Sequence, residues 1–224
     1  MRFHIITIFP EMFDSYLKES ILGRAQKSKL IDFKFYNPRD FIKAPKNNYK
    51  PVDDKPYGGG PGMVMRAEPL LKAVAKALNV VKGKKVLIVN FIPSALKFTT
   101  ASAKTLSKKY TDIVLICGRY EGIDARIDKI LKTKKFSIGD YVLTGGELPA
   151  MVLIDSISRQ IKGVLGKYES LEEERVSSSE VYTRPEVLKY PFGKAQGKKS
   201  KNYRVPKVLL SGHRAKIEEW KKKV

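Results

Sequence analysis

The sequence predicts an α/β fold with a mainly parallel sheet and helices on both faces. Apolar runs such as 112–117 are continuous rather than alternating, as in parallel strands that are buried on both sides. Segments with helical periodicity separate these runs, which is typical of α/β proteins. A loop with three glycines, 137–149, joins one apolar segment to a helix. Open α/β sheets hold nucleotide-like ligands in such loops, at the ends of their strands.

The predicted elements alternate along the chain as this fold requires. Continuous apolar or alternating segments predict strands at 3–8, 31–36, 85–90 and 112–117, and a short apolar segment, 136–138, leads into the glycine-rich loop. Apolar side chains that recur on one face predict helices at 11–28, 67–79, 99–110, 123–131 and 147–161. The stretch 37–66 is rich in proline and glycine, and a loop of this length in a compact domain is usually functional.

Apolar residues become sparse after position 163, so we expect the α/β domain to span 1–163. The segment 164–204 is rich in Glu, Ser, Lys and Gly and predicts a flexible linker. In 205–224 a helix that begins near Ser211 places Ile217 and Trp220 on one face. The sequence therefore predicts a small helical C-terminal domain.

The charge of the chain favours a polyanionic partner. Lys and Arg number 44 against 23 Asp and Glu, for a net charge of +21. The basic residues gather between folded segments rather than in one tail, which favours nucleic acid over a merely solvated basic surface. The clusters are at 82–85, 129–135, 194–201 and 221–223.

The sequence lacks several motifs that mark common phosphate, dinucleotide and metal sites. It contains no P-loop, no G-x-G-x-x-G after a strand and no Cys/His cluster with zinc spacing. Cys117, the single cysteine, excludes a disulfide framework and is expected to be a buried hydrophobe. His4 is expected to be structural, and His213 to be exposed or a local cap. With no signal peptide and no apolar stretch of transmembrane length, we expect a soluble cytoplasmic protein that does not contact membranes.

Four long motifs occur in order: YGGGPGM at 57–63, CGRYEGID at 117–124, SIGDYVLTGGELP at 137–149 and YTRPE at 182–186. With them the chain resembles the bacterial tRNA (guanine-N1)-methyltransferases, which methylate the guanine just 3′ of the anticodon. The match runs from Phe9 to His213. One glycine-rich loop would be weak evidence, whereas four motifs in register are specific.

The resemblance implies a SPOUT-class fold with a trefoil knot in the C-terminal part of the sheet, although general topology rules speak against knots. It also implies a homodimer whose active site is completed across the interface. S-adenosylmethionine would lie between the loops 90–94, 118–122 and 137–149, where backbone groups can pair with adenine and apolar side chains can enclose it. The implied cofactor-binding residues are Pro93, Gly118, Tyr120, Glu121, Gly122, Ser137, Ile138, Gly139, Asp140, Tyr141, Val142, Leu143, Gly145, Gly146 and Pro149.

The implied reaction transfers a methyl group from a sulfonium to N1 of guanine in tRNA. Because N1 carries a proton near neutral pH, a base must remove it, and a cationic donor at O6 would stabilise the charge that develops there. The family uses a carboxylate and an arginine for these roles. Arg159 matches the arginine; the alternative is a solvated charge at a helix end.

The position of the base is ambiguous. The family has an aspartate in an acidic-Ser-aromatic-x-Asp-Gly stretch, and this chain reads ESLEEER at 169–175. Anchoring on Glu169 selects Glu173, which we slightly favour, whereas counting back from 182–185 selects Glu174. Alternatively, these glutamates are solvated linker charges.

Two further matches concern the RNA. Asp53 matches a family aspartate that reads the guanine preceding the target, and a carboxylate can accept hydrogen bonds from that base edge. An Asx turn before Pro56 explains Asp53 equally well. Gly59 and its neighbours in 58–62 would let their loop pass close to the RNA and to the methionine end of the cofactor.

The chain departs from the family at two places. The segment 189–204 is longer than usual and strongly basic, and we expect it to contact tRNA phosphates. The chain stops at Val224 where relatives continue, so a reduced C-terminal RNA-binding domain is expected. Two other functions stay open: a different knotted RNA methyltransferase, acting on ribosomal RNA or a ribose hydroxyl, and a noncatalytic RNA-binding protein. A dependence on Mg²⁺ is also open.

Overall fold

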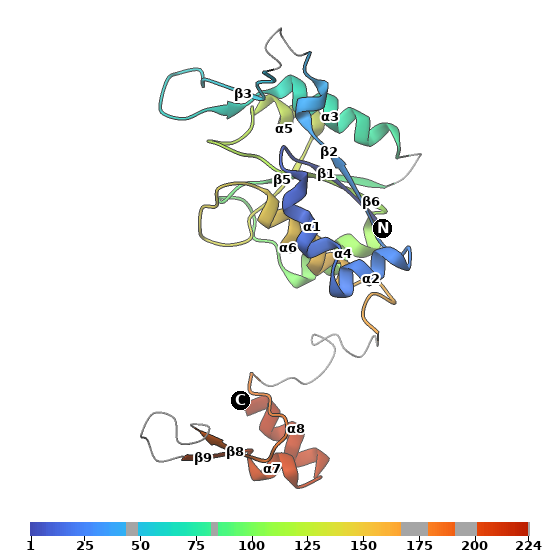
Figure 1. Ribbon diagram of the computed structural model, residues 1–224, viewed down its shortest axis with the longest axis vertical. Helices are drawn as coiled ribbons and strands as arrows, with labels where there is room; N and C mark the ends of the chain where they lie inside the picture. The colour runs from blue at the N-terminus through green and yellow to red at the C-terminus, as the bar shows by residue number, and fades with distance from the viewer. Residues whose placement is uncertain (44–48, 82–84, 167–178, 191–200, 224) are drawn as a thin grey trace. The chain divides into compact units, whose positions relative to one another are not determined.

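The computed structural model describes residues 1–43, 49–81, 85–166, 179–190 and 201–223. The chain divides into two compact units, Met1–Gly166 and Lys167–Val224. The first unit holds a parallel sheet and its helices, and the second holds a β-hairpin and two helices (Figure 1). The sequence predicts a domain boundary at position 163.

A five-stranded sheet forms the centre of the first unit, with the order β2-β1-β6-β5-β7. Every pair of neighbouring strands in it is parallel, which confirms the predicted sheet type. The strand predicted least well is the last, because the sequence indicates only an apolar lead-in at 136–138. The strands are β1 (Arg2–Ile6), β2 (Asp32–Tyr36), β5 (Val86–Phe91), β6 (Asp112–Ile116) and β7 (Lys134–Phe136).

The two faces of the sheet bury separate apolar clusters. On β1, Ile5 belongs to one cluster and Ile6 to the other; on β6, Ile113 and Val114 divide in the same way. Successive side chains of a strand point to opposite faces. A strand covered on both faces must therefore be apolar at consecutive positions, which is why 112–117 shows no alternation.

Helices supply the other half of each cluster. α3 and α5 cover one face of the sheet, and α1, α2, α4 and α6 cover the other (Figure 1). This arrangement confirms the predicted helices on both faces. The helices are α1 (Asp14–Leu17), α2 (Ser20–Lys27), α3 (Ala67–Asn79), α4 (Thr100–Lys109), α5 (Arg126–Leu131) and α6 (Glu147–Arg159).

The prediction of one helix over 11–28 is wrong. The segment forms a 3-10 helix, η1 (Pro10–Phe13), followed by α1 and α2. The break lies at Ser20, whose φ of +48° is in the left-handed region that side-chain-bearing residues rarely adopt. The helix predicted over 123–131 also begins later, at Arg126.

The segment 37–66 is more structured than a loop. It contains the 3-10 helix η2 (Pro38–Phe41) and a short antiparallel pair, β3 (Asp53–Asp54) with β4 (Val64–Met65). Arg66 N donates to Val52 O at 2.8 Å, which ties the pair to the start of α3. The glycine-rich stretch between β3 and β4 is therefore held at its base, while the side chain of Tyr57 is fully exposed.

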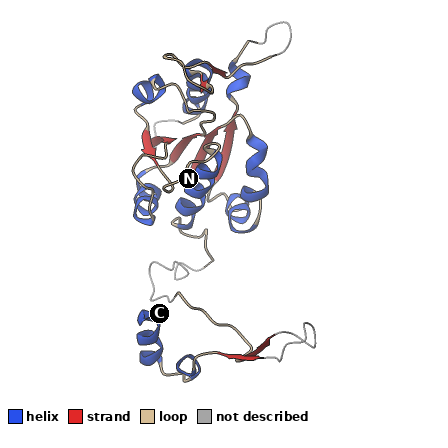
Figure 2. Ribbon diagram, turned by 90° about the vertical axis from the view of Figure 1, so that its left-hand side faces the viewer, coloured by secondary structure: helices blue, strands red, loops and turns tan. Residues whose placement is uncertain are grey.

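The second unit differs from the predicted flexible linker over 164–204. Within that range, β8 (Val187–Tyr190) pairs antiparallel with β9 (Lys201–Arg204), as Figure 2 shows in red. Residues 167–178 and 191–200 lie outside the described residues. The helix predicted from near Ser211 corresponds to α8 (Arg214–Lys223), and a short helix that was not predicted, α7 (Lys207–Leu210), precedes it. The rings of Tyr182 and Trp220, 6.2 Å apart, connect α8 to the segment before β8.

His4 is fully buried in the centre of the sheet, which agrees with a structural role. Its Nε2 lies 3.2 Å from Asp112 Oδ1, and its Nδ1 lies 3.1 Å from Tyr36 Oη. Burial lowers the pKa of His4, because the charged imidazolium would lose its hydration, and the Asp112 carboxylate only partly opposes this. Burial also acts to raise the pKa of Asp112, but hydrogen bonds from Thr111 and His4 outweigh it and lower that pKa.

Cys117 is buried at the end of β6, and burial raises the pKa of its thiol well above the ordinary value. The residue therefore packs as a small hydrophobe, as predicted. Across the described ranges, no helix combines the length and the apolar character that a membrane span needs. The trefoil knot stays a prediction.

Acidification from about pH 7 to about pH 5 should lower the free energy of unfolding by about 1 kcal/mol through His4. The folded state holds the His4 proton less readily than the unfolded state. As pH falls below about 6.5, the unfolded state therefore gains protons first and stability is lost. Urea unfolding at several pH values measures this. His4→Gln, which cannot become charged, should lose less stability over the same range, and an equal loss in both proteins would contradict the assignment.

Candidate functional site

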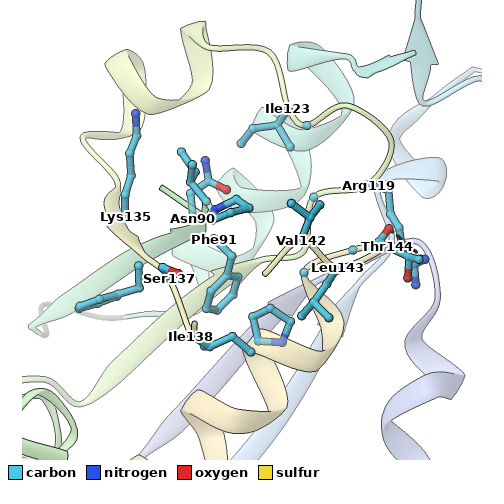
Figure 3. A pocket seen from close by; sticks show the side chains of 18 of the residues that line it. Asn90, Phe91, Arg119, Ile123, Lys135, Ser137, Ile138, Val142, Leu143 and Thr144 are labelled. Atoms are coloured by element: carbon cyan, nitrogen blue, oxygen red, sulfur yellow. Dashed lines mark hydrogen bonds between the residues drawn. The ribbon is translucent and has the colours of Figure 1, made fainter. Parts of the chain in front are cut away.

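A pocket of about 450 Å³ lies at the carboxyl ends of β5, β6 and β7 (Figure 3). Asn90 and Phe91 at the end of β5, Gly118 just after β6 and Phe136 at the end of β7 all line it. Open α/β sheets bind their ligands at this edge. The volume falls within the range of small-molecule sites.

The beginning of the loop 137–146 is fixed to the segment after β5. Ser137 N donates to Leu96 O at 2.9 Å, and Phe98 N donates to Ser137 O at 2.8 Å. The hydroxyl of Ser137 donates to Gly139 O at 2.9 Å and so closes a tight turn. Backbone bonds and the Ser137 hydroxyl therefore hold one wall of the pocket in place.

The end of the same loop lies against β6. Gly146 N donates to Gly118 O at 2.8 Å. A Cβ on Gly146 would lie 2.7 Å from Cys117 Cα, closer than real Cβ atoms approach a backbone. Only glycine allows the two chain segments to meet at this distance, and the meeting point closes the pocket.

The loop 118–122 forms a second wall and is bound to the segment around β4. Glu121 N donates to Met63 O at 3.0 Å. Tyr120 has a φ of +60° and Gly122 a φ of +122°, so the loop turns sharply twice. Burial and the neighbouring Asp53 carboxylate, which accepts a hydrogen bond from the Tyr120 hydroxyl, raise the pKa of Tyr120.

The side chains that line the pocket are largely apolar. Phe91, Ile138, Val142 and Leu143 gather around it in Figure 3. Val142 is 83% exposed and Leu143 is 36% exposed. Apolar side chains that line a pocket and still face solvent are suited to enclose the faces of a flat ligand.

A carboxylate on α5 adds a negative charge to this pocket. Asn90 Nδ2 donates to Asp128 Oδ1 at 3.0 Å, and Lys135 Nζ lies 2.9 Å from Asp128 Oδ2. Burial acts to raise the pKa of Asp128, but hydrogen bonds from Thr133, Lys135 and Asn90 lower it below its ordinary value. Sequence reasoning missed Asp128 and Lys135, and no local motif marks them because the cluster joins three separate elements.

A buried ion pair supports the wall formed by Arg119. Arg119 Nε lies 3.0 Å from Glu147 Oε2, although the N–H direction does not satisfy hydrogen-bond geometry. Thr7 Oγ1 donates to Glu147 Oε1 at 2.9 Å, and the Arg119 guanidinium lies 4.8 Å from the centre of the Phe9 ring. The sequence places Arg119 in the motif CGRYEGID at 117–124 but indicates no role for it.

Nearly all of the predicted cofactor-binding residues line the pocket. The exception is Asp140, which is exposed and forms an ion pair with Lys97 at 2.5 Å. The structure thus brings the three predicted loops together around one cavity. The residues that line it are Pro93, Gly118, Tyr120, Glu121, Gly122, Ser137, Ile138, Gly139, Tyr141, Val142, Leu143, Gly145, Gly146 and Pro149.

Neither Asp53 nor Gly59, which are predicted to contact RNA, lines this pocket. Asp53, on β3, contacts Tyr120, which lines the pocket. Gly59 has a φ of +79°, and a Cβ there would meet nothing within 4 Å. The loop that contains Gly59 is therefore open to a partner on its outer side.

The predicted catalytic residues are not brought to the pocket within the described residues. Arg159 ends α6, ten residues beyond Pro149 and thus about 15 Å along the helix axis. Its Nε is buried and has no hydrogen-bond partner in the part of the chain that the structure describes. Glu173 and Glu174 lie outside the described residues.

Comparison with known proteins agrees with the resemblance. The whole chain, residues 1–224, matches the family described as tRNA (Guanine-1)-methyltransferase TrmD. The tRNA (guanine-N(1)-)-methyltransferase of Clostridioides difficile (strain 630) is 44% identical over 222 residues, which cover 99% of this chain and 91% of the relative. The enzymes of the same name from Buchnera aphidicola subsp. Acyrthosiphon pisum (strain APS) and Marinomonas sp. (strain MWYL1) are 44% and 42% identical, over 99% and 100% of this chain and 88% and 84% of the relatives.

Gly146→Ala should lower the free energy of unfolding of the first unit by about 1–3 kcal/mol, because the new Cβ collides with the backbone of Cys117 and Gly118, just after β6. Gly166→Ala is the matched control, since a Cβ there meets nothing within 4 Å and the change should fall within about 0.5 kcal/mol. Urea unfolding measures both. Equal stability of the two variants would show that the close approach at Gly146 is not required.

Proposed function

Because the chain belongs to the tRNA (Guanine-1)-methyltransferase TrmD family, we propose that its pocket binds S-adenosylmethionine and that the modified base is the guanine 3′ of the anticodon. Methyl transfer to guanine N1 of tRNA is the activity that the family and its relatives carry. The observation that supports the cofactor site is the convergence of three separate loops on one cavity at the carboxyl ends of β5, β6 and β7.

The residues present fit this cofactor. Ile138, Val142 and Leu143 would enclose the adenine, and backbone groups of the tightly turned loops would pair with its edge. Asp128, whose lowered pKa keeps it ionised, complements a ligand that carries a sulfonium and an ammonium group. When bound, the cofactor supplies an electrophilic methyl group; the surrounding residues hold it and exclude water.

The chain's own acid–base chemistry takes place on guanine. Glu173 or Glu174 would accept the proton from N1, and Arg159 would donate to O6 as negative charge develops there. A buried donor without a partner costs about 1–3 kcal/mol. Because the Nε of Arg159 is buried and unpaired, a movement of the side chain that brings this donor to O6 would relieve that cost.

The position of Arg159 supports a homodimer. Leu148, Val152, Asp155 and Arg159 follow one another on one face of α6, at spacings of three and four residues. Leu148 and Val152 are 52% and 45% exposed, and Tyr16 of α1 donates to Asp155 beside them. An exposed apolar stripe of this kind suits an interface. Because about 15 Å separate Arg159 from its own pocket, we propose that it serves the pocket of a second copy.

The remaining assignments concern RNA and metal. Asp53 would read the guanine that precedes the target, with Tyr120 holding its carboxylate beside the pocket. Gly59 would let its loop approach the RNA. Over the described residues, no group of three or more His, Cys, Asp and Glu side chains could hold a metal ion. Methylation assays decide whether Mg²⁺ has a role: a metal-dependent reaction stops when a chelator is added and resumes when Mg²⁺ is restored. We place the reaction in the cytoplasm.

Single-turnover methylation of a tRNA with guanine 3′ of the anticodon should give product at N1. Glu173→Gln should slow this step by about 10²–10⁴-fold, because glutamine cannot accept the N1 proton, whereas Glu174→Gln should stay close to wild type. The rate is measured against pH. A slow Glu174→Gln variant with a normal Glu173→Gln variant would move the base to Glu174. Product at another atom, or no product from the wild-type protein, would overturn the proposed function.

Arg159→Ala should lower the methylation rate by about 10²–10³-fold while leaving S-adenosylmethionine binding, measured by calorimetry, intact. Val142→Arg should block the pocket with a cation and abolish that binding. If the site is shared between subunits, mixed dimers of the two inactive variants regain activity, since each contains one complete site. Lys162→Ala, which removes an exposed charge near the same helix end, is the control and should be fully active. A mixture without activity would place Arg159 and the pocket of one site in the same chain.

A further inference from the structure

The hairpin of the second unit gathers aromatic side chains on one face. The register pairs Leu188 with Tyr203 and Tyr190 with Lys201. Because side chains alternate along a strand, these four residues share one face of the hairpin, which we call the tyrosine face. The opposite face carries Val187, Lys189, Asn202 and Arg204.

The tyrosine face is exposed to solvent. Leu188 is 43% exposed, Tyr190 49% and Tyr203 51%. Every residue of β9 is exposed as well, so neither face of the hairpin rests on a core. A two-stranded hairpin is marginally stable by itself. An exposed aromatic patch on such an element is typical of a binding surface rather than of a structural support.

The charges around the tyrosine face indicate the chemistry of its partner. The two strands carry Lys189, Lys201 and Arg204 and no acidic residue. Lys201 Nζ lies 5.7 Å from the centre of the Tyr203 ring, so a cation and a ring are presented side by side. Single-stranded nucleic acid is bound by this combination, in which bases stack on aromatic rings and cations contact the neighbouring phosphates.

We propose that the tyrosine face stacks an unpaired base of the tRNA anticodon loop, with Tyr203 as the platform and Lys201, on the same face, on a flanking phosphate. The inference rests on the tRNA methyltransferase function proposed above and adds a substrate contact outside the pocket. It also separates two kinds of contact. Stacking requires an unstacked base and depends little on salt, whereas phosphate contacts form with any RNA and weaken as salt increases.

The test measures the dissociation constant of an anticodon stem-loop RNA at several salt concentrations. Tyr203→Leu keeps an apolar residue opposite Leu188 but removes the ring, and it should weaken binding about tenfold at every salt concentration. Tyr203→Phe should bind like wild type, because phenylalanine stacks equally well. Lys201→Gln, on the same face, should instead lower the dependence of log Kd on log salt by about one phosphate contact. A fully paired RNA duplex of the same length should not distinguish Tyr203→Leu from wild type.

Two results would overturn the stacking contact: wild-type affinity of Tyr203→Leu for the stem-loop, or an equal loss for stem-loop and duplex. Calorimetry with S-adenosylmethionine shows that each variant retains a folded first unit. Methylation of the same stem-loop by the wild-type protein separates the two proposals. If the wild type methylates N1 and Tyr203→Leu binds normally, only the stacking contact fails; if the wild type does not methylate, the proposed function fails whether or not Tyr203 stacks.

Discussion

The arrangement of the first unit depends on one backbone contact, between the end of the loop 137–146 and the end of β6. Gly146 donates to Gly118 at 2.8 Å, and no side chain fits between the two segments. Because α6 begins at the next residue, the same contact sets where that helix starts and where Glu147 meets Arg119. The walls of the pocket and the axis of α6 are therefore fixed together, and a shift in one would displace the other.

Much of this unit can be predicted from sequence because its signals are local. Consecutive apolar residues in 112–117 can be buried only between two layers of helices, and glycines after strands mark close approach of the backbone. The break at Ser20 is marked only by Gly23, where a Cβ would lie 2.2 Å from Lys18 O, and a single glycine inside a helical pattern does not by itself predict a break. Asp128 also lacks a local signal. It lies on α5, and its contacts in the pocket, Asn90 and Lys135, lie on β5 and β7.

The second unit shows a different limit of sequence reasoning. A strand is recognised by an apolar face that it must bury, and β8 and β9 bury almost nothing. Their alternation of Leu188 and Tyr190 with polar residues is short, and the pairing partner lies beyond a glycine- and lysine-rich stretch. Composition therefore favours a linker, although main-chain pairing gives the segment a definite shape. Such a hairpin acts through exposed side chains, whereas sequence periodicity detects strands by the side chains that they bury.

The proposed function requires the chain to bind both RNA and a cationic cofactor, and the surface and the pocket differ in charge. The protein as a whole is strongly basic, with a net charge of +21, yet the carboxylates of Glu121 and Asp128 balance Arg119 and Lys135 in the lining of the pocket. A basic exterior attracts RNA at long range, whereas a carboxylate inside a narrow cavity acts over a few ångströms on a cationic ligand. Lys135 offsets part of the charge of Asp128, so the attraction is moderate. If the pocket binds S-adenosylmethionine as proposed, loss of the positive charge from sulfur on methyl transfer would weaken the attraction to Asp128 and so favour release of the product.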